Sequence, residues 1–402
     1  MSFQQGLSGL NAAAKNLDVI GNNVANSGTV GFKQSQAQFA DVYANSLTGA
    51  GGSQVGIGVQ VATVAQQFTQ GNITSTNNPL DIAINGGGFF RMDNGGEITF
   101  QRNGQFQLDR NGFIVGSGGA FLTGYTADAS GVLSTGAPAP LFINTADIVP
   151  QLTTGIDSVL NLDSTKSPLL AASFNQNDPT TFHNSTSVSI YDSLGNAHTL
   201  QTYYVKTAAG TWSVFASTDG APATSVGTLN FNTDGTLTTA MPLTTSVAVT
   251  TGATTPFAVD IDFTGTTQFG SSFSVNKLTQ DGYTSGRLAG FSIAGNGIIQ
   301  GRYTNGQSAV LGQVVLASFA NPNGLQPLGN NMWSDTAASG APLIGTPNSG
   351  SLGVLQSSAV EDSNVDLTAE LVNMITAQRV YQANAQTIKA QDAVLQTLVN
   401  LR

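Results

Sequence analysis

The sequence predicts a multidomain, mainly β protein, with two β-rich domains nested in sequence and an α-helical coiled-coil domain formed by the N- and C-terminal segments. Three observations predict this class. Apolar residues recur at heptad spacing at both ends, and residues 354–402 contain no Gly or Pro although the chain has 47 glycines. Short alternating apolar runs with Asn-Gly pairs fill 80–115 and 288–319. A Thr- and Ser-rich stretch at 150–284 separates those two blocks.

The N-terminal segment is predicted to form a helix over residues 3–26. Its seam advances by steps of three and four residues, as in a coiled coil, and comprises Leu7, Leu10, Ala14, Leu17, Gly21 and Val24. Ser2 with Gln5 predicts a capping box, and Gly28 predicts the end of the helix. Gly21 costs about 1 kcal/mol relative to Ala inside a helix, so we expect it to admit the close approach of a partner helix.

The C-terminal segment predicts a second helix over about 365–401, starting from a cap at Ser363 and Asp366. Asp392 interrupts its apolar pattern, and Leu398 widens the stripe near the end. The seam comprises Leu367, Leu371, Met374, Gln378, Tyr381, Ala385, Ile388, Leu395 and Val399.

These two seams permit two arrangements. The helices could form an intramolecular hairpin on the β core, or they could pack between chains. Seam residues such as Ala14, Gly21 and Gln378 are small or polar, so one pair of helices would bury little apolar surface. Because isolated helices are marginal in water, the composition favours packing among many copies.

The β regions are predicted from alternation and turns. Val55 to Val61 alternate as a half-buried strand. Asn94-Gly95, Asn103-Gly104 and Asn111-Gly112 predict hairpin turns. The resulting boundaries are 1–28 and 362–402 for the terminal helices, 29–70 and 350–361 for linkers, 71–149 and 285–349 for the first β domain, and 150–284 for the inserted β domain. The mixed pattern of 30–70 also permits a structured contact.

Composition excludes several classes of protein. The formal net charge is −10, and so few cations make nucleic-acid binding improbable. The chain has no Cys, which removes disulfides and thiolate zinc sites. No apolar run approaches the 18 residues of a membrane span, and the N-terminus lacks the basic and apolar regions of a cleaved signal peptide.

Residues with catalytic or ligand-binding potential are better explained structurally. His183 and His198 lack the spacing of a metal helix, and we expect two surface or strand-end residues. Residues 85–88 (Asn-Gly-Gly-Gly) lack the Lys of a phosphate loop and predict a tight turn that lets two strands cross closely.

Two acidic patterns are also better explained by structural roles. Residues 230–235 resemble the front of a calcium loop, but its twelfth position is Met241, so a β-turn is the better interpretation. Asp260 and Asp262 share a strand face, where solvation is expected rather than glycosidase chemistry. We therefore predict no catalytic, cofactor or metal residues and no enzymatic activity.

Three sequence stretches resemble bacterial flagellar rod and hook proteins. The first runs from Ser8 to Asn26, followed by Gly31-Phe32-Lys33; the second is Asp81 to Phe90; the third runs from Ser363 to Lys389. Val380 is a mild departure, because Asn is commoner there in the family. The inserted stretch at 150–284 favours hook over rod, since rod proteins are shorter.

The resemblance implies a structural subunit that forms a curved hollow tube, a universal joint that transmits torque from rod to filament. It implies export through the flagellar type III apparatus without a cleaved signal, and assembly outside the cell under a cap protein. The implied partners are further copies, the hook cap, the distal rod and the hook–filament junction proteins. The terminal helices would line the channel, and the inserted domain would lie outermost. A distal-rod-like protein and a secreted Thr-rich β adhesin are the alternatives.

Overall fold

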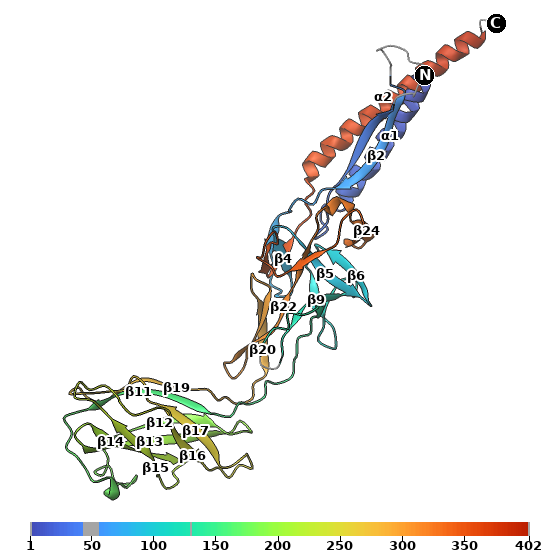
Figure 1. The fold of residues 1–402 in the computed structure, drawn as a ribbon. Helices are drawn as coiled ribbons and strands as arrows, with labels where there is room; N and C mark the ends of the chain where they lie inside the picture. The colour runs from blue at the N-terminus through green and yellow to red at the C-terminus, as the bar shows by residue number, and fades with distance from the viewer. Residues whose placement is uncertain (1, 43–55, 129–130, 401–402) are drawn as a thin grey trace. The chain divides into compact units, whose positions relative to one another are not determined.

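A computed structural model describes residues 2–42, 56–128 and 131–400 of the chain; the side chains of residues 2 and 398–400 are outside the description. The chain forms two compact units, which are described separately. Unit 1 comprises Met1–Asn144, Gly290–Gly301 and Ser308–Arg402, and unit 2 comprises Thr145–Ala289 and Arg302–Gln307. Figure 1 shows mainly strands, with one helix near each end of the chain. The predicted fold class is confirmed.

The helices are α1 (Ser2–Ala25) and α2 (Leu367–Asn400). The Asp366 carboxylate accepts bonds from the backbone N–H groups of Thr368 and Ala369, so Asp366 caps α2. The helix therefore begins two residues after the predicted start. In α1, the Gln5 side chain donates to the carbonyl of Gly56. No helix in the described part of the chain has both the length and the apolar composition needed to cross a membrane.

Both segments predicted as linkers contain strands. Strands β1 (Ser35–Val42) and β2 (Gly58–Gln66) form an antiparallel pair beside α1, and residues 43–55 lie outside the description. Strands β27 (Val354–Ser357) and β28 (Ala359–Glu361) pair with β4 (Ile82–Asn85) and β3 (Ile73–Ser75). In 29–70 the structure has the structured contact that the mixed pattern also permitted, and a strand overlaps the alternating Val55–Val61 run. In 350–361 the strands pair with partners distant in sequence, which local spacing does not reveal.

One large sheet forms most of the β part of unit 1. Its strand order is β20-β21-β22-β9-β5-β6-β25-β24, with the remaining strands attached at the side. A cluster of aromatic rings in edge-to-face contact, including Phe89, Phe319 and Trp333, fills part of its core. The strands are β5 (Phe89–Asn94), β6 (Glu97–Gln101), β7 (Phe106–Leu108), β8 (Ile114–Gly116), β9 (Phe121–Thr126), β10 (Ala139–Pro140), β20 (Leu288–Ile293), β21 (Ile298–Tyr303), β22 (Ser308–Val314), β23 (Leu316–Ser318), β24 (Gln326–Gly329), β25 (Met332–Ser334) and β26 (Leu343–Gly345).

Two of the three Asn-Gly pairs at 94–112 close hairpins. Gly95 and Gly112 have positive φ and join paired strands, β5 to β6 and β7 to β8. Asn103-Gly104 joins β6 to β7, which do not pair, so that hairpin prediction is wrong. The carbonyl of Gly104 instead accepts a bond from the Ile82 N–H, 2.9 Å away, so the chain turns toward β4.

Unit 2 is all-β, with two sheets that share one hydrophobic core. The first sheet has the order β16-β17-β11-β18, with β19 on β11, and the second has the order β12-β13-β14-β15. Trp212, Leu160 and Phe263 are fully buried between them. The strands are β11 (Gly155–Asp163), β12 (Asn184–Tyr191), β13 (Ala197–Ala208), β14 (Thr211–Thr218), β15 (Thr224–Asn230), β16 (Leu243–Val247), β17 (Phe257–Asp262), β18 (Thr267–Phe269) and β19 (Ser274–Gln280). The described residues also form two short 3-10 helices, Ala171–Ser173 in unit 2 and Pro322–Gly324 in unit 1.

Candidate functional site

The two terminal helices pack against each other and run antiparallel. A Cβ placed on Gly9 would lie 2.7 Å from the Asn384 side-chain oxygen, and one on Gly6 would lie 3.2 Å from Ile388 Cγ1. These two glycines therefore allow the close approach that the sequence assigned to Gly21. A Cβ at Gly21 would meet nothing within 4 Å, so that assignment is wrong within one chain.

The observed seam on α1 lies one residue before the predicted one. Gly6, Ala13 and Ile20 are buried at seven-residue intervals. Leu7, the next residue, is 44% exposed. One residue turns an α-helix by about 100°, so the predicted seam is turned by that angle from the face that packs on α2. Its other members are half-buried rather than enclosed: Leu10, Ala14, Leu17, Gly21 and Val24.

The same displacement occurs in the first half of α2, whereas further along the helix the predicted seam residue Ile388 lies against Gly6. Glu370 and Ala377 are buried seven residues apart, whereas Leu371 is 45% exposed and Gln378 is exposed. Among the other predicted residues, the exposed ones are Leu367, Tyr381 and Leu395, the half-buried ones are Met374, Ala385 and Ile388, and the side chain of Leu398 lies outside the described residues. The contact within one chain consists mostly of small and amide residues, with Ile20 and Ile388 among them. A role for the apolar seam between chains stays a prediction.

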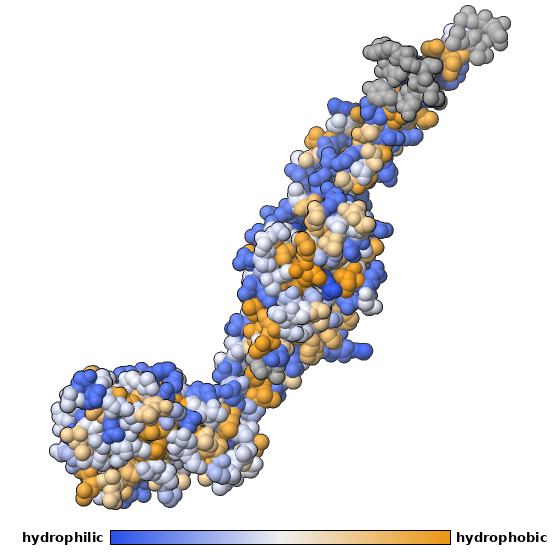
Figure 2. Space-filling model, in the orientation of Figure 1, coloured by the Kyte–Doolittle hydropathy of each residue, from blue (hydrophilic) through white to orange (hydrophobic). Residues whose placement is uncertain are grey.

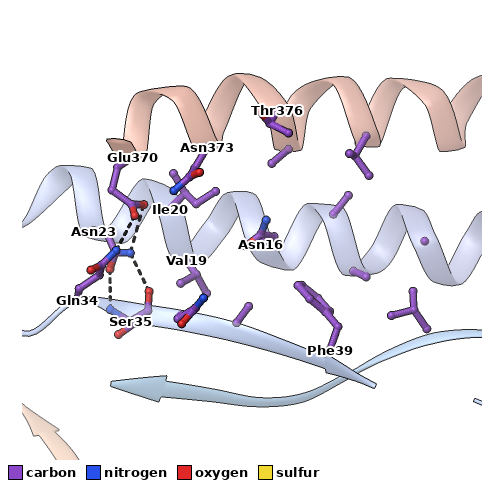
Figure 3. Close-up of a pocket in the computed structure, with 18 of the residues that line it drawn as sticks. Asn16, Val19, Ile20, Asn23, Gln34, Ser35, Phe39, Glu370, Asn373 and Thr376 are labelled. Atoms are coloured by element: carbon purple, nitrogen blue, oxygen red, sulfur yellow. Dashed lines mark hydrogen bonds between the residues drawn. The ribbon is translucent and has the colours of Figure 1, made fainter. Parts of the chain in front are cut away.

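A groove of about 810 Å³ lies between α1, β1 and α2. Figure 3 shows its residues, with Asn16 and Val19 on α1, Phe39 on β1, and Asn373 and Thr376 on α2. Its lining is mostly small and amide side chains, and Glu370 is its one carboxylate. Such a lining offers shape and hydrogen bonds to a packing partner, and it carries no nucleophile paired with a base.

Buried polar groups hold the end of this groove (Figure 3). Asn23 exchanges two hydrogen bonds with the Ser35 backbone, at 2.8 and 2.9 Å, and its amide lies 3.4 Å from a Glu370 oxygen. The Gln34 amide donates to the other Glu370 oxygen at 2.7 Å. Asn364 accepts a bond from the Gln34 N–H and donates to the carbonyl of Gln67. These bonds fix the start of α2 against α1 and the hairpin.

A buried ion cluster lies where the chain leaves the helices. Lys33 Nζ is 2.6 Å from one Glu361 oxygen, and Arg102 Nη1 is 3.0 Å from the other. The Glu361 side chain is fully buried, and the Gly71 N–H also donates to it. Burial lowers the pKa of Lys33 and of Arg102, and Glu361 opposes both shifts.

Sequence reasoning missed this cluster because its members are 259 and 328 residues apart. Only 9% of the residues are charged. Because charged residues are so few, each of them was a candidate for a specific ion pair. Lys33 belongs to the Gly31-Phe32-Lys33 motif, which by itself gives no sign of a buried ion pair. The same motif holds Gly31, whose φ of +72° and contact with the Asn103 backbone exclude a side chain.

The two histidines lie apart in unit 2. His198 is a strand-end residue, but it is buried: Nδ1 lies 2.6 Å from Asp219 and Nε2 lies 3.3 Å from Asp192. Burial alone would lower the pKa of His198, but the two carboxylates raise it above its ordinary value. His183 Nε2 donates to the Ser167 carbonyl, and the ring lies edge-on to Trp212.

The remaining motifs have the structural roles expected of them. Gly86 packs against Gly353, where a Cβ would lie 2.9 Å from the glycine Cα, so the Asn-Gly-Gly-Gly segment is a close crossing. The Gly235 N–H donates to Asn232, which forms the β-turn predicted in place of a calcium loop. Asp260 accepts a bond from Thr244 on an exposed strand face. Within the described residues, no group of His, Cys, Asp and Glu could hold a metal ion.

Comparisons with known protein families cover most of the chain. Residues 3–33 match the flagella basal body rod protein family, and residues 356–401 match the flagellar basal body rod FlgEFG protein C-terminal family. Residues 83–156 match the flagellar hook protein FlgE/F/G D1 domain, and residues 161–283 match the flagellar basal body protein FlaE D2 domain. Together with the paired terminal helices and the β units, these matches define an axial protein of the bacterial flagellum.

Full-length relatives narrow this class. The chain is 45% identical to the flagellar hook protein FlgE of Salmonella typhimurium and 43% identical to that of Escherichia coli K12, with all of each chain covered. A hook protein FlgE of Borreliella burgdorferi is 32% identical over all of this chain and 99% of the relative. The chain therefore belongs to the flagellar hook protein family and is a structural subunit of the hook in the flagellar basal body.

The fold agrees with a solved structure of a hook protein. The crystal structure of Helicobacter pylori FlgE2 matches with a TM-score of 0.55, covering 72% of this chain and all of that chain. At 14% identity, this likeness concerns the fold alone.

Proposed function

We propose that copies of this chain polymerise into a curved hollow tube that transmits torque from rod to filament while it bends. Membership of the hook family is the reason to propose a polymer of this kind. The observation that carries the proposal is the apolar stripe on α1, in which Phe3 and Leu7 are exposed and Leu10, Ala14 and Leu17 are only half-buried. Burying that stripe between chains would contribute roughly 25 cal/mol per Å² of apolar surface. The chain thus acts as a structural rather than a catalytic subunit.

The proposal includes a route and partners. The subunit is exported through the flagellar type III apparatus without a cleaved signal and assembles outside the cell. It contacts the distal rod at one end of the tube, the hook–filament junction proteins at the other, and the cap during growth. The terminal helices line the channel, and unit 2 lies on the outside of the tube. The support for these statements is membership of the hook family.

The test compares two charge substitutions on α1. Leu7→Asp places a carboxylate in the exposed stripe, whereas Gln4→Asp places one on an exposed face outside it. Tubes are counted by negative-stain electron microscopy after concentration in a kosmotropic salt with fragments of parental tube as seeds. We expect tubes from Gln4→Asp and none from Leu7→Asp, with equal helix content in both monomers. Normal tubes from Leu7→Asp would show that the stripe is not a subunit contact.

A further inference from the structure

Helix α2 extends past the start of α1. Gly6 lies against Ile388 and Gly9 against Asn384, which sets a register that places Ser2 level with about residue 392. At 1.5 Å per residue, the rest of α2, residues 393–400, projects about 12 Å beyond α1. Figure 1 shows α2 continuing past the labelled N-terminal end. We call residues 393–400 the overhang.

The overhang continues the face of α2 that packs on α1. Ile388 is half-buried against Gly6, and Leu395 follows it seven residues later on the same face. Leu395 is 53% exposed and its neighbour Val394 is 54% exposed, whereas Ala377 on the covered part of that face is 4% exposed. The helix therefore presents a packing surface there that no described residue encloses.

A surface of matching spacing runs along α1 beside the face that packs on α2. It begins at Phe3 and Leu7, which are both exposed, and continues through the half-buried Leu10, Ala14 and Leu17. Figure 2 shows apolar residues interspersed with hydrophilic ones over the surface of the helices. We call this surface the α1 stripe. Steps of three and four residues are those that receive the knobs of another helix.

We propose that the overhang of one chain packs on the α1 stripe of a second copy. Within one chain the two surfaces cannot meet, because the overhang projects beyond the end of the helix on which the stripe lies. The covered face of α1 is already occupied by its own α2, which leaves the stripe as the apolar surface available to a neighbour. This inference rests on the proposed polymerisation. It identifies the two segments through which neighbouring subunits make contact.

The contact joins two different surfaces, so it is heterologous. A heterologous contact does not saturate at a dimer: each chain offers a free overhang and a free stripe, and copies add head to tail. A head-to-tail contact whose rotation does not close a ring produces an open helical polymer. A change in the overhang should therefore affect assembly and leave the fold of the monomer intact.

Cysteine cross-linking tests the pairing, because the natural chain has no Cys. The double variant Leu10→Cys/Leu395→Cys is assembled into tubes and treated with a short bismaleimide. We expect a ladder of covalent trimers and longer species on a denaturing gel. Mixing the two single variants before assembly should stop the products at dimers, since each chain then carries one reactive end.

Matched controls move one cysteine around its helix. Asn11→Cys is one residue along and turned by about 100° from Leu10, and Thr397→Cys lies on the opposite face of α2 from Leu395. Pairing either control with the correct partner should reduce ladder yield at least tenfold. Control pairs that give the same ladder yield as Leu10→Cys/Leu395→Cys would overturn the proposal. It would also be overturned if the double variant forms tubes, as seen by microscopy, but its cross-linked products end at dimers. If the parental chain forms no tubes, the proposed function fails, and this pairing with it.

A second variant does not depend on cross-linking. Leu395→Asp should reduce tube yield at least tenfold and leave the thermal midpoint of the monomer within about 1 °C, because Leu395 lies in the uncovered overhang. Tubes in normal yield from Leu395→Asp would refute the contact, whereas failure of Leu7→Asp with normal assembly of Leu395→Asp would keep the proposed function and reject the overhang as the occupant.

Discussion

Removing the charge of Glu361 tests the junction between the helices and the sheet of unit 1. This carboxylate is fully buried between Lys33 and Arg102. Glu361→Gln keeps the shape and one acceptor oxygen, but it leaves two buried cations without a counter-charge. Breaking a buried ion pair by removing one partner costs about 3–5 kcal/mol. In a unit of this size, each kcal/mol lowers the unfolding midpoint by about 2–4 °C, so we expect a fall of about 6–20 °C.

The two tryptophans provide the assay, because each reports on one unit. Trp333 is buried in unit 1 and Trp212 in unit 2. In a Trp212→Phe background, fluorescence follows unit 1 alone during thermal or urea unfolding. The matched control is Glu370→Gln: Glu370 is also buried, but it accepts bonds only from amides, and its change should cost about 1 kcal/mol. A fall of less than 1 kcal/mol for Glu361→Gln, or an equal fall for both variants, would refute the reasoning.

Three further predictions concern individual positions. Gly21→Ala should raise the unfolding free energy of unit 1 by about 1 kcal/mol, because the site is open, whereas Gly31→Ala should lower it by at least about 2 kcal/mol through its positive φ and backbone contact; urea unfolding measures both. Asp366→Ala removes the cap of α2 and should cost about 0.5–2 kcal/mol, measured by thermal denaturation followed at 222 nm. The pKa of His198 is raised on folding, so its contribution to unit 2 is complete below pH 6.5 and is lost as pH rises through the raised pKa; His198→Gln should flatten that decline in Trp212 fluorescence melts, and an unchanged pH profile would count against it.

The sequence allowed the two terminal helices and the mainly β fold class to be predicted, because periodicity is a local property. It placed the helix seam one residue too late on α1 and in the first half of α2, whereas the predicted seam residue Ile388 lies against Gly6. The apolar residues Leu7 and Leu371 defined the predicted seam, whereas Gly6, Gly9 and Ala377 make the contact. Hydrophobic periodicity identifies an apolar face, but it does not say whether that face meets its own chain or a neighbour.

Long-range pairing was beyond such reasoning. Nothing in the local pattern of 350–361 indicates that β27 and β28 pair with β4 and β3, since their partners lie more than 250 residues earlier. The Asn103-Gly104 pair shows the same limit, because the chain there turns toward β4, where the Ile82 N–H donates to the Gly104 carbonyl. Strand edges and buried ion pairs are selected by tertiary partners, which spacing along one segment does not reveal.

The position of Glu361 also sets an order of events during synthesis. Lys33 and Arg102 emerge from the ribosome long before their carboxylate, and β3 and β4 emerge before the strands that pair with them. Unit 2 has all but six of its residues once Ala289 is made. Closure of such distant contacts is slow relative to local ones. In a nascent chain, most of unit 2 is therefore available to fold before unit 1. The N-terminal part of unit 1 reaches its final structure only after the C-terminal residues that carry β27, β28 and Glu361 have been made.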